Sequence, residues 1–577
     1  MKTKLRYIAI AIAFAGAQQA FAQKKDENIG TEVVNVVKPY TPTISDAFKV
    51  KETPVIEDEQ EKQKEEINYN IFSFPVASTF APDKGKAATV DKEAREKYYN
   101  NYATLGIGNY GTINAELFVT ENVSDTDYMG GMLRHLSSQG GIDAAKVDDN
   151  YYNTALDLTY GSRQQGYNWS TDLGYQNQVY NWYGLPLEFI DIAPETIAEV
   201  DPQQTYHTFY IGGKIQTKDS YFHDASAQYK RFWDAYGSAE NRFFLTPSLD
   251  IPIMDEKIKV DLVADYVGGT FEKDINDMGD MSYSHFNLGI QPSLLYQKED
   301  LSVQLGAGIF YSMGKMNEET DNKIFVYPQV KASYKVVGDL MIAYAGAEGT
   351  LRQNSYADFV SQNPFVSPTL AVAPTDQQYD IYVGLKGKLA STVAYNIRGS
   401  YMNEDNRAFF VNNALLSSLG DDEGYSYGNS FGLVYDRLQT ISFFGELKAD
   451  FSQKIHFGIN GTYYSYSTDD LEEAFNMPQM KVGASLDVDI TPKWYAGTNI
   501  FFTGERKDVV MVTSGDLETV NLESFFDLNA HLGYKYNERL TGFLKLNNIT
   551  GQDYQRWVNY PVQGFQFLIG ASYKFNF

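Results

Sequence analysis

The chain has 577 residues, 48 basic and 74 acidic side chains, a formal net charge of −26 and no cysteine. So acidic a chain cannot neutralise the phosphates of a nucleic acid, and a chain without cysteine has no disulfides. Its 44 tyrosines, 36 phenylalanines and 46 glycines are typical of a β-rich protein. We therefore expect an all-β fold and no nucleic-acid partner.

Residues 1–22 have the features of a secretory signal peptide. Three basic residues precede the apolar segment Tyr7–Ala17, and Ala20-Phe21-Ala22 matches a small-residue cleavage site. After residue 22 no apolar run is long enough for a transmembrane helix. We expect the mature chain to begin at Gln23 and to be soluble, cell-surface or a barrel.

Residues 23–97 are expected to form a mostly unstructured extension. Pro39, Pro42 and Pro54 interrupt regular structure, and the region is too small and polar for a packed domain. One β-prone run suits pairing with a partner by strand addition, although short valine-rich runs also occur by chance. That candidate binding segment consists of Thr31, Glu32, Val33, Val34, Asn35, Val36 and Val37.

From residue 98 to residue 577, apolar and polar side chains alternate. The pattern is clearest in Tyr379–Lys386, Met480–Ile490 and Phe526–Tyr536. A period of two indicates β-strands, and charged side chains at every second site require that one face is wet. Lipid outside and water inside meets this requirement, and closing the sheet removes the unpaired edges that hydrocarbon does not tolerate. We predict a transmembrane antiparallel β-barrel.

Connection lengths give an independent test of the barrel. Short turns such as Val337–Asp339 and Thr491–Lys493 alternate with long loops such as Gln178–Gln203 and Arg352–Gln377. Short periplasmic turns and long external loops are typical of outer-membrane barrels. When Phe431–Phe451 is taken as one long strand, about 22 strands result, and both termini lie on the periplasmic side.

The last strand carries apolar residues at alternate positions up to the terminal residue. They are Phe565, Phe567, Ile569, Tyr573, Phe575 and Phe577. This strand resembles the closing strand of bacterial outer-membrane barrels, and Leu544–Tyr560 resembles the last hairpin of the TonB-dependent receptors. The receptors carry a larger globular plug ahead of the barrel, and residues 23–97 leave no room for one.

The resemblance implies a place in the outer membrane of a Gram-negative cell, with lipid around the barrel. It also implies insertion by the barrel-assembly machinery, which reads the terminal motif. TonB, or another envelope protein, is the implied partner of Thr31–Val37.

No motif in the chain points to catalysis. The six histidines are scattered without metal-ligand spacing, and no nucleophile elbow, phosphate loop or dinucleotide fingerprint occurs. Asp274, Asp277 and Asp280, with Asp421, Asp422 and Glu423, could hold Ca²⁺, although a solvated acidic loop is the favoured interpretation. We expect no enzyme, no cofactor and no metal.

The long loops are rich in aromatic side chains. If exposed, these contact a ligand or a partner; alternatively, the loops pack on one another over the barrel mouth. The candidate loop contacts are Trp182, Tyr183, Phe189, Phe365, Phe409 and Phe410.

Two functions follow, and a third is weaker. The first is uptake or transport across the outer membrane by a TonB-dependent-receptor-like barrel. The second is a plugless barrel that serves as a structural or partner-docking subunit of an outer-membrane assembly or secretion machine. The third is a passive porin. Because a 22-stranded barrel has a wide lumen, inward side chains, residues 23–97 or another protein should fill it.

Overall fold

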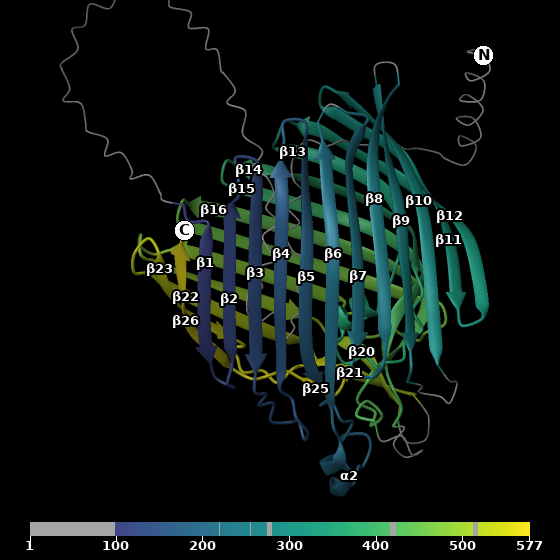
Figure 1. The fold of residues 1–577 in the computed structure, drawn as a ribbon, viewed down its shortest axis with the longest axis vertical. Helices are drawn as coiled ribbons and strands as arrows, with labels where there is room; N and C mark the ends of the chain where they lie inside the picture. Colours follow the sequence, from purple (N-terminus) through teal and green to yellow (C-terminus); the bar gives the residue numbers. More distant parts are fainter. Residues whose placement is uncertain (1–97, 219, 254–255, 274–279, 416–422, 512–516) are drawn as a thin grey trace, which may run out of the picture.

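The protein is described by a computed structural model that covers residues 98–577 except 219, 254–255, 274–279, 416–422 and 512–516. The predicted signal peptide and the extension 23–97 with Thr31–Val37 lie outside the described residues. So do Asp274, Asp277, Asp421 and Asp422. Within the described part, no helix is long and apolar enough to cross a membrane. The main element is one sheet of 22 strands (Figure 1).

The first eleven strands of the sheet take up the N-terminal half of the described chain. They are β1 (Asn101–Gly108), β2 (Ile113–Asn122), β3 (Asp127–Ser138), β4 (Tyr151–Arg163), β5 (Tyr167–Asn181), β6 (Gln203–Thr217), β7 (Phe222–Asp234), β8 (Ala239–Ile253), β9 (Glu256–Phe271), β10 (Met281–Lys298) and β11 (Leu301–Met316).

The other eleven strands of the sheet lead to the C-terminus. They are β12 (Glu319–Val337), β13 (Met341–Arg352), β14 (Thr375–Ala390), β15 (Val393–Asn412), β16 (Phe431–Ser452), β17 (Ile455–Thr468), β18 (Met480–Asp489), β19 (Trp494–Thr503), β22 (Phe525–Lys535), β23 (Leu540–Asn547) and β26 (Gln566–Phe575).

Six further short elements lie in the described parts of the connections between barrel strands. They are the helices α2 (Pro194–Glu199) and α3 (Tyr356–Gln362), the hairpin of β20 (Arg506–Met511) and β21 (Leu517–Leu522), and the pair β24 (Gln555–Trp557) and β25 (Tyr560–Pro561).

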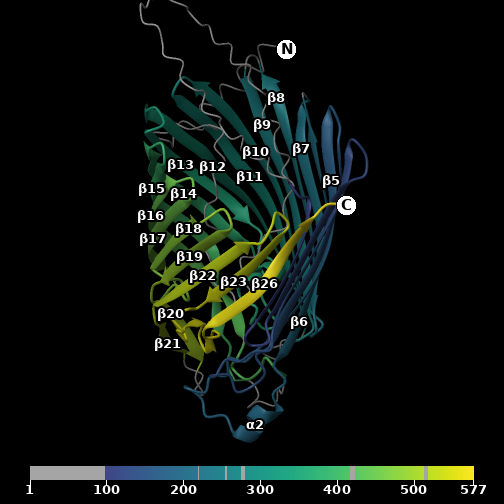
Figure 2. The same ribbon diagram turned by 90° about the vertical axis from the view of Figure 1, so that its left-hand side faces the viewer.

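The sheet closes on itself. Every strand pairs antiparallel with its neighbours, and β1 pairs with β26 from Asn101↔Phe575 to Gly108↔Leu568. Figure 2 shows β26 beside the barrel's first strands. The predicted antiparallel barrel of about 22 strands is confirmed, and the long segment predicted from Phe431 is the single strand β16.

Side chains sort by alternation into two faces. In β26, Phe567 and Ile569 are exposed on the outer face whereas Leu568 is buried. In β14, Ile381 and Val383 face outward, while the hydroxyl of Tyr382 donates to Glu348 across the inner wall at 2.8 Å. The apolar outer face and polar inner face match the predicted pattern.

Glycine allows the inner tyrosines to lie against the wall. A Cβ atom at Gly346 would stand 2.4 Å from the ring of Tyr382, which is its partner in the β13–β14 register. Any larger residue there would push the ring away. The high glycine content therefore partly reflects aromatic side chains that lie across neighbouring strands.

A charge on the outer face should destabilise the barrel. Val383 lies at the middle of β14 with 65 % of its surface exposed. In Val383→Arg the guanidinium would sit at mid-height in lipid, which should lower the free energy of unfolding by about 2–4 kcal/mol. Denaturant titration in vesicles measures this loss. Ser400→Arg, on the adjacent strand and facing the lumen, is the control, and an equal loss there would contradict the assignment of faces.

The two ends of the barrel differ. Short turns and the C-terminus lie at one end, called here the turn end, where Trp494 packs against Tyr534 with ring centroids 4.6 Å apart. The long connections and α2 lie at the opposite end, the loop end (Figure 1). Short connections at the turn end and long ones at the loop end agree with the prediction, although the loop end also has short connections at 109–112, 235–238 and 317–318.

Candidate functional site: a mouth closed by loops

The connections at the loop end pack together into one apolar cluster, called here the loop core. It joins the connections 182–202, 353–374, 413–430 and 548–565 to inward side chains of the barrel wall. Its most buried large side chains are Trp182, Tyr206, Phe232, Phe271, Tyr356, Tyr425, Phe431 and Tyr560.

Tyr560 lies at a junction of the loop core. Its ring stacks on Phe365 with centroids 3.8 Å apart and meets Tyr183 edge-on at 4.9 Å. Its hydroxyl donates to the backbone carbonyl of Asn429, and the hydroxyl of Tyr183 donates to the carbonyl of Pro561 at 2.9 Å. One residue thus links four connections that are far apart in the sequence.

The loop aromatics are buried, as expected if the loops pack on one another over the barrel mouth. Trp182, Tyr183 and Phe365 are buried in the loop core, and Phe189 is half-buried against it. Phe410 belongs to the same core, and Phe409 is buried in a second cluster with Leu438 and Ala474. The loops therefore pack on one another. The physical reason is that burying an apolar ring against its neighbours is more favourable in free energy than exposing it to water.

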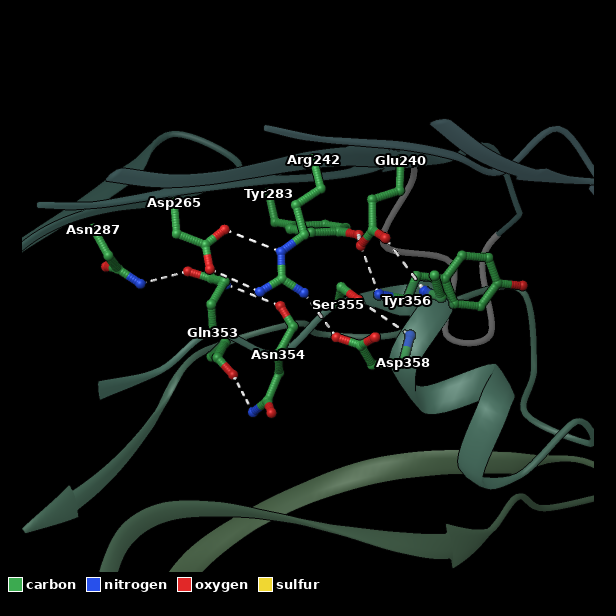
Figure 3. A network of polar contacts seen from close by, with 12 residues as sticks. Glu240, Arg242, Asp265, Tyr283, Asn287, Gln353, Asn354, Ser355, Tyr356 and Asp358 are labelled. Carbon is green, nitrogen blue, oxygen red and sulfur yellow. Dashed lines mark hydrogen bonds and ion pairs between the residues drawn. The ribbon is translucent and has the colours of Figure 1, made fainter. Parts of the chain in front are cut away.

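A polar network holds the connection 353–374 against the barrel wall (Figure 3). The guanidinium of Arg242 on β8 makes two hydrogen bonds to Asp265 on β9, at 3.0 and 2.7 Å. It also donates to Asp358 of α3 at 2.9 Å. Arg242 therefore fastens the helix to the wall, and we call this set of residues, together with Glu240, the α3 latch.

Glu240 completes the latch at the start of α3. Its carboxylate accepts the backbone N–H groups of Tyr356 at 2.6 Å and Ala357 at 3.3 Å, and the hydroxyl of Tyr283. Ser355 caps the helix by accepting the N–H of Asp358 at 3.1 Å. These bonds satisfy backbone donors that the first turn leaves free.

The hairpin β20–β21 is fastened to the same region. Arg506 donates to the carbonyls of Gln555 and Arg556, both at 2.6 Å. The Asp508 carboxylate accepts the N–H groups of Val509 at 2.9 Å and Val558 at 3.3 Å. Asp508 is fully buried, and burial raises its pKa to about 7 although these N–H groups and Arg506 lower it.

This raised pKa predicts that stability of the loop core falls as pH rises. The folded chain keeps the Asp508 proton up to about pH 7, whereas an unfolded aspartate releases it near pH 3.8. Between these values the folded state binds more protons, so each rise in pH favours unfolding. Amide exchange of residues 555–565 between pH 4 and 7, corrected for intrinsic rates, should show the loss, and Asp508→Asn should flatten it. An unchanged slope in the variant would contradict the assignment.

The α3 latch and the loop core could not be predicted from the sequence. Glu240 and Arg242 are recognisable as lumen-facing charges on a strand, but Asp358, the partner of Arg242, lies 116 residues further along the chain.

No group of three or more histidines or carboxylates in the described residues is arranged to hold a metal ion.

The closed 22-stranded barrel has the fold of the TonB-dependent receptors, so the resemblance in the sequence is confirmed at the level of fold. Similar structures include the ferripyoverdine receptor of the outer membrane of Pseudomonas aeruginosa (TM-score 0.61, 12% identity, 84% of this chain and 72% of that chain). The siderophore receptor PirA from Acinetobacter baumannii gives 0.61 and 12%, over 84% and 81%. The FrpB iron transporter from Neisseria meningitidis gives 0.62 and 11%, over 83% and 83%.

At these identities the likeness concerns the fold alone. No family model and no curated protein sequence matches the chain.

Proposed function

We propose that this protein is an outer-membrane barrel that moves a solute across that membrane, with the loop end outside and the turn end in the periplasm. The apolar outer face, the closed sheet and the fold shared with iron-uptake receptors support this function. Lipid surrounds the barrel, and the barrel-assembly machinery inserts it by reading Phe565–Phe577. Residues 98–577 form the barrel domain, after a signal peptide at 1–22 and a periplasmic extension at 23–97.

The observation that carries the proposal is the closed mouth. The loops of the chain itself occupy the loop end, where the buried loop core is fastened by the α3 latch. A transporter needs such a closure, because a lumen of 22 strands left open would leak solutes. TonB, pairing with Thr31–Val37, is the proposed source of energy for opening it.

Deleting residues 23–40 tests this function. The transport hypothesis predicts that growth on the transported nutrient is lost while the barrel still inserts and that TonB no longer co-purifies. The control replaces residues 81–90, in the same extension, with a glycine-serine segment of equal length. Normal growth of the deletion strain on every nutrient tested would contradict energised uptake.

The loop core also favours a second function, a docking subunit of an outer-membrane machine. Several loop side chains are as inaccessible as those of a protein interior, with Trp182, Tyr356 and Leu370 at 0 % exposure, which suits a permanently closed mouth. Purification from native membranes separates the two: stoichiometric envelope subunits without TonB favour the machine. High conductance of the pure wild-type protein would contradict both and support a porin.

A further inference from the structure

A cavity of about 690 Å³ lies at the loop end between the connection 353–374 and the inner wall. Its walls come from the loop ends of β10, β11 and β12 on one side, and of β14, β15 and β16 on the other. This volume is within the range of small-molecule sites, about 300–1,000 Å³. The loop core therefore leaves room for a ligand beside it.

The lining of the cavity is acidic. Among the described residues that line it, seven side chains are acidic and three are basic, which gives a net charge of −4. Arg437 is engaged with Asp405 and Asp469, at 3.5 and 3.2 Å, and Lys323 pairs with Asp321 at 2.7 Å.

Some of these carboxylates have no basic partner. Among the described residues, the lining carboxylates that form no ion pair are Glu319, Asp376, Asp436 and Asp470, and Lys315 is the one lining base that forms none. Asp376 accepts a hydrogen bond from the hydroxyl of Tyr327 at 2.7 Å, which fixes its position without neutralising it. The local field in the cavity is therefore negative and disfavours anionic solutes.

His285 is an independent sign of a ligand. It lines the cavity and is only 7 % exposed. Its Nε2 lies 2.9 Å from the carbonyl oxygen of Val372, so Nε2 carries the proton and donates. Nδ1, the other ring nitrogen, is then an acceptor, and within the described part of the chain it has no hydrogen-bond partner.

Gly314, also in the lining, leaves Nδ1 accessible. A Cβ atom at this position would stand 3.0 Å from Nδ1. The cavity thus offers a buried neutral acceptor beside several carboxylates. These groups match a ligand rich in N–H donors.

We propose that this cavity binds an organic cation with several amine groups, and this inference rests on the proposed transport function. A single metal ion does not fit, because no three histidines or carboxylates in the described residues are arranged around one point. An extended polyamine does fit, since its charges can reach carboxylates on both walls while one amine donates to His285. The cavity would then select cations at the mouth before passage.

Calorimetric titration of the full-length protein in detergent with spermine tests the site. We expect saturable binding that weakens with salt. The double variant Asp376→Asn, Asp470→Asn should weaken it at least about tenfold, because two charged partners are lost. Gly314→Ala, which covers Nδ1 without altering charge, should also weaken it. The matched control is Asp191→Asn, Glu195→Gln, which removes two exposed charges from the connection 182–202 outside the cavity.

Three results would overturn the proposal: no heat of binding with spermine, tighter binding of citrate than of spermine, or equal weakening by the control pair. Failure of the site is distinguishable from failure of the function. Loss of nutrient uptake on deletion of 23–40 without spermine binding refutes the cation site alone. Spermine binding with normal uptake after that deletion refutes energised transport alone.

Discussion

Replacing Tyr560 by alanine should unfold the loop core while leaving the barrel intact. Tyr560 is 1 % exposed, stacks on Phe365, meets Tyr183 edge-on and bonds to the carbonyl of Asn429. Removing a buried aromatic side chain costs about 3–5 kcal/mol, because both contacts and a filled volume are lost. We expect amide exchange in 182–190 and 555–565 to accelerate at least about a hundredfold, consistent with that cost.

Two variants make this test specific. Tyr560→Phe keeps the ring contacts and loses one hydrogen bond, so its effect should be near 1 kcal/mol. Tyr536→Ala removes an exposed tyrosine at the turn end and should leave exchange of the loop core unchanged. If Tyr560→Ala instead abolished the heat-modifiable gel mobility of the barrel, the loop core would not be separable from the sheet.

Replacing Arg242 by alanine should open the mouth. The buried carboxylate of Asp265 would lose two hydrogen bonds and α3 would lose its ion pair to the wall. Leaving a buried charge unpaired costs about 3–5 kcal/mol. If the connection 353–374 moves away from the wall, water can reach the Asp265 carboxylate, which lowers this cost. We expect single-channel conductance in planar bilayers to rise well above that of the wild type.

Arg398→Ala is the matched control for this experiment. Arg398 is also a lumen-facing arginine, paired with Asp380 on the neighbouring strand, but its pair does not involve a loop residue. This variant should stay closed. Equal conductance in the two variants would indicate that loss of any wall charge opens the lumen and that the α3 latch does not hold the mouth.

The sequence predicts the barrel well because each strand position faces either lipid or water, and this environment alone determines whether the residue there is apolar or polar. Ile381 and Val383 meet the outside and Tyr382 the inside, and each choice is visible without knowing any distant partner. The residues of the loop core show no comparable local pattern in the sequence. Tyr560 and Asn429 are 131 residues apart. The identity of an aromatic residue in a loop does not reveal whether its ring is exposed to water or packed against another ring.

The α3 latch lies between these extremes. Arg242 is identifiable as an inward charge from the alternation within β8, which suffices to predict that something polar faces it. The sequence does not indicate whether that partner is water, a neighbouring strand or a returning loop. Only the closed sheet, which sets β8 opposite the connection 353–374, decides this.

The circular pairing of the sheet has a consequence for biogenesis. Tyr183 and the carbonyl that it binds at Pro561 are separated by 378 residues, and β1 finds its second neighbour only in the last strand. Contacts that span so much of the chain form late, because each requires a very long loop to be closed first. While the sheet is still open, the loop end would therefore have no lid, so pairing of the first and last strands and completion of the loop core would belong to the same late step of folding.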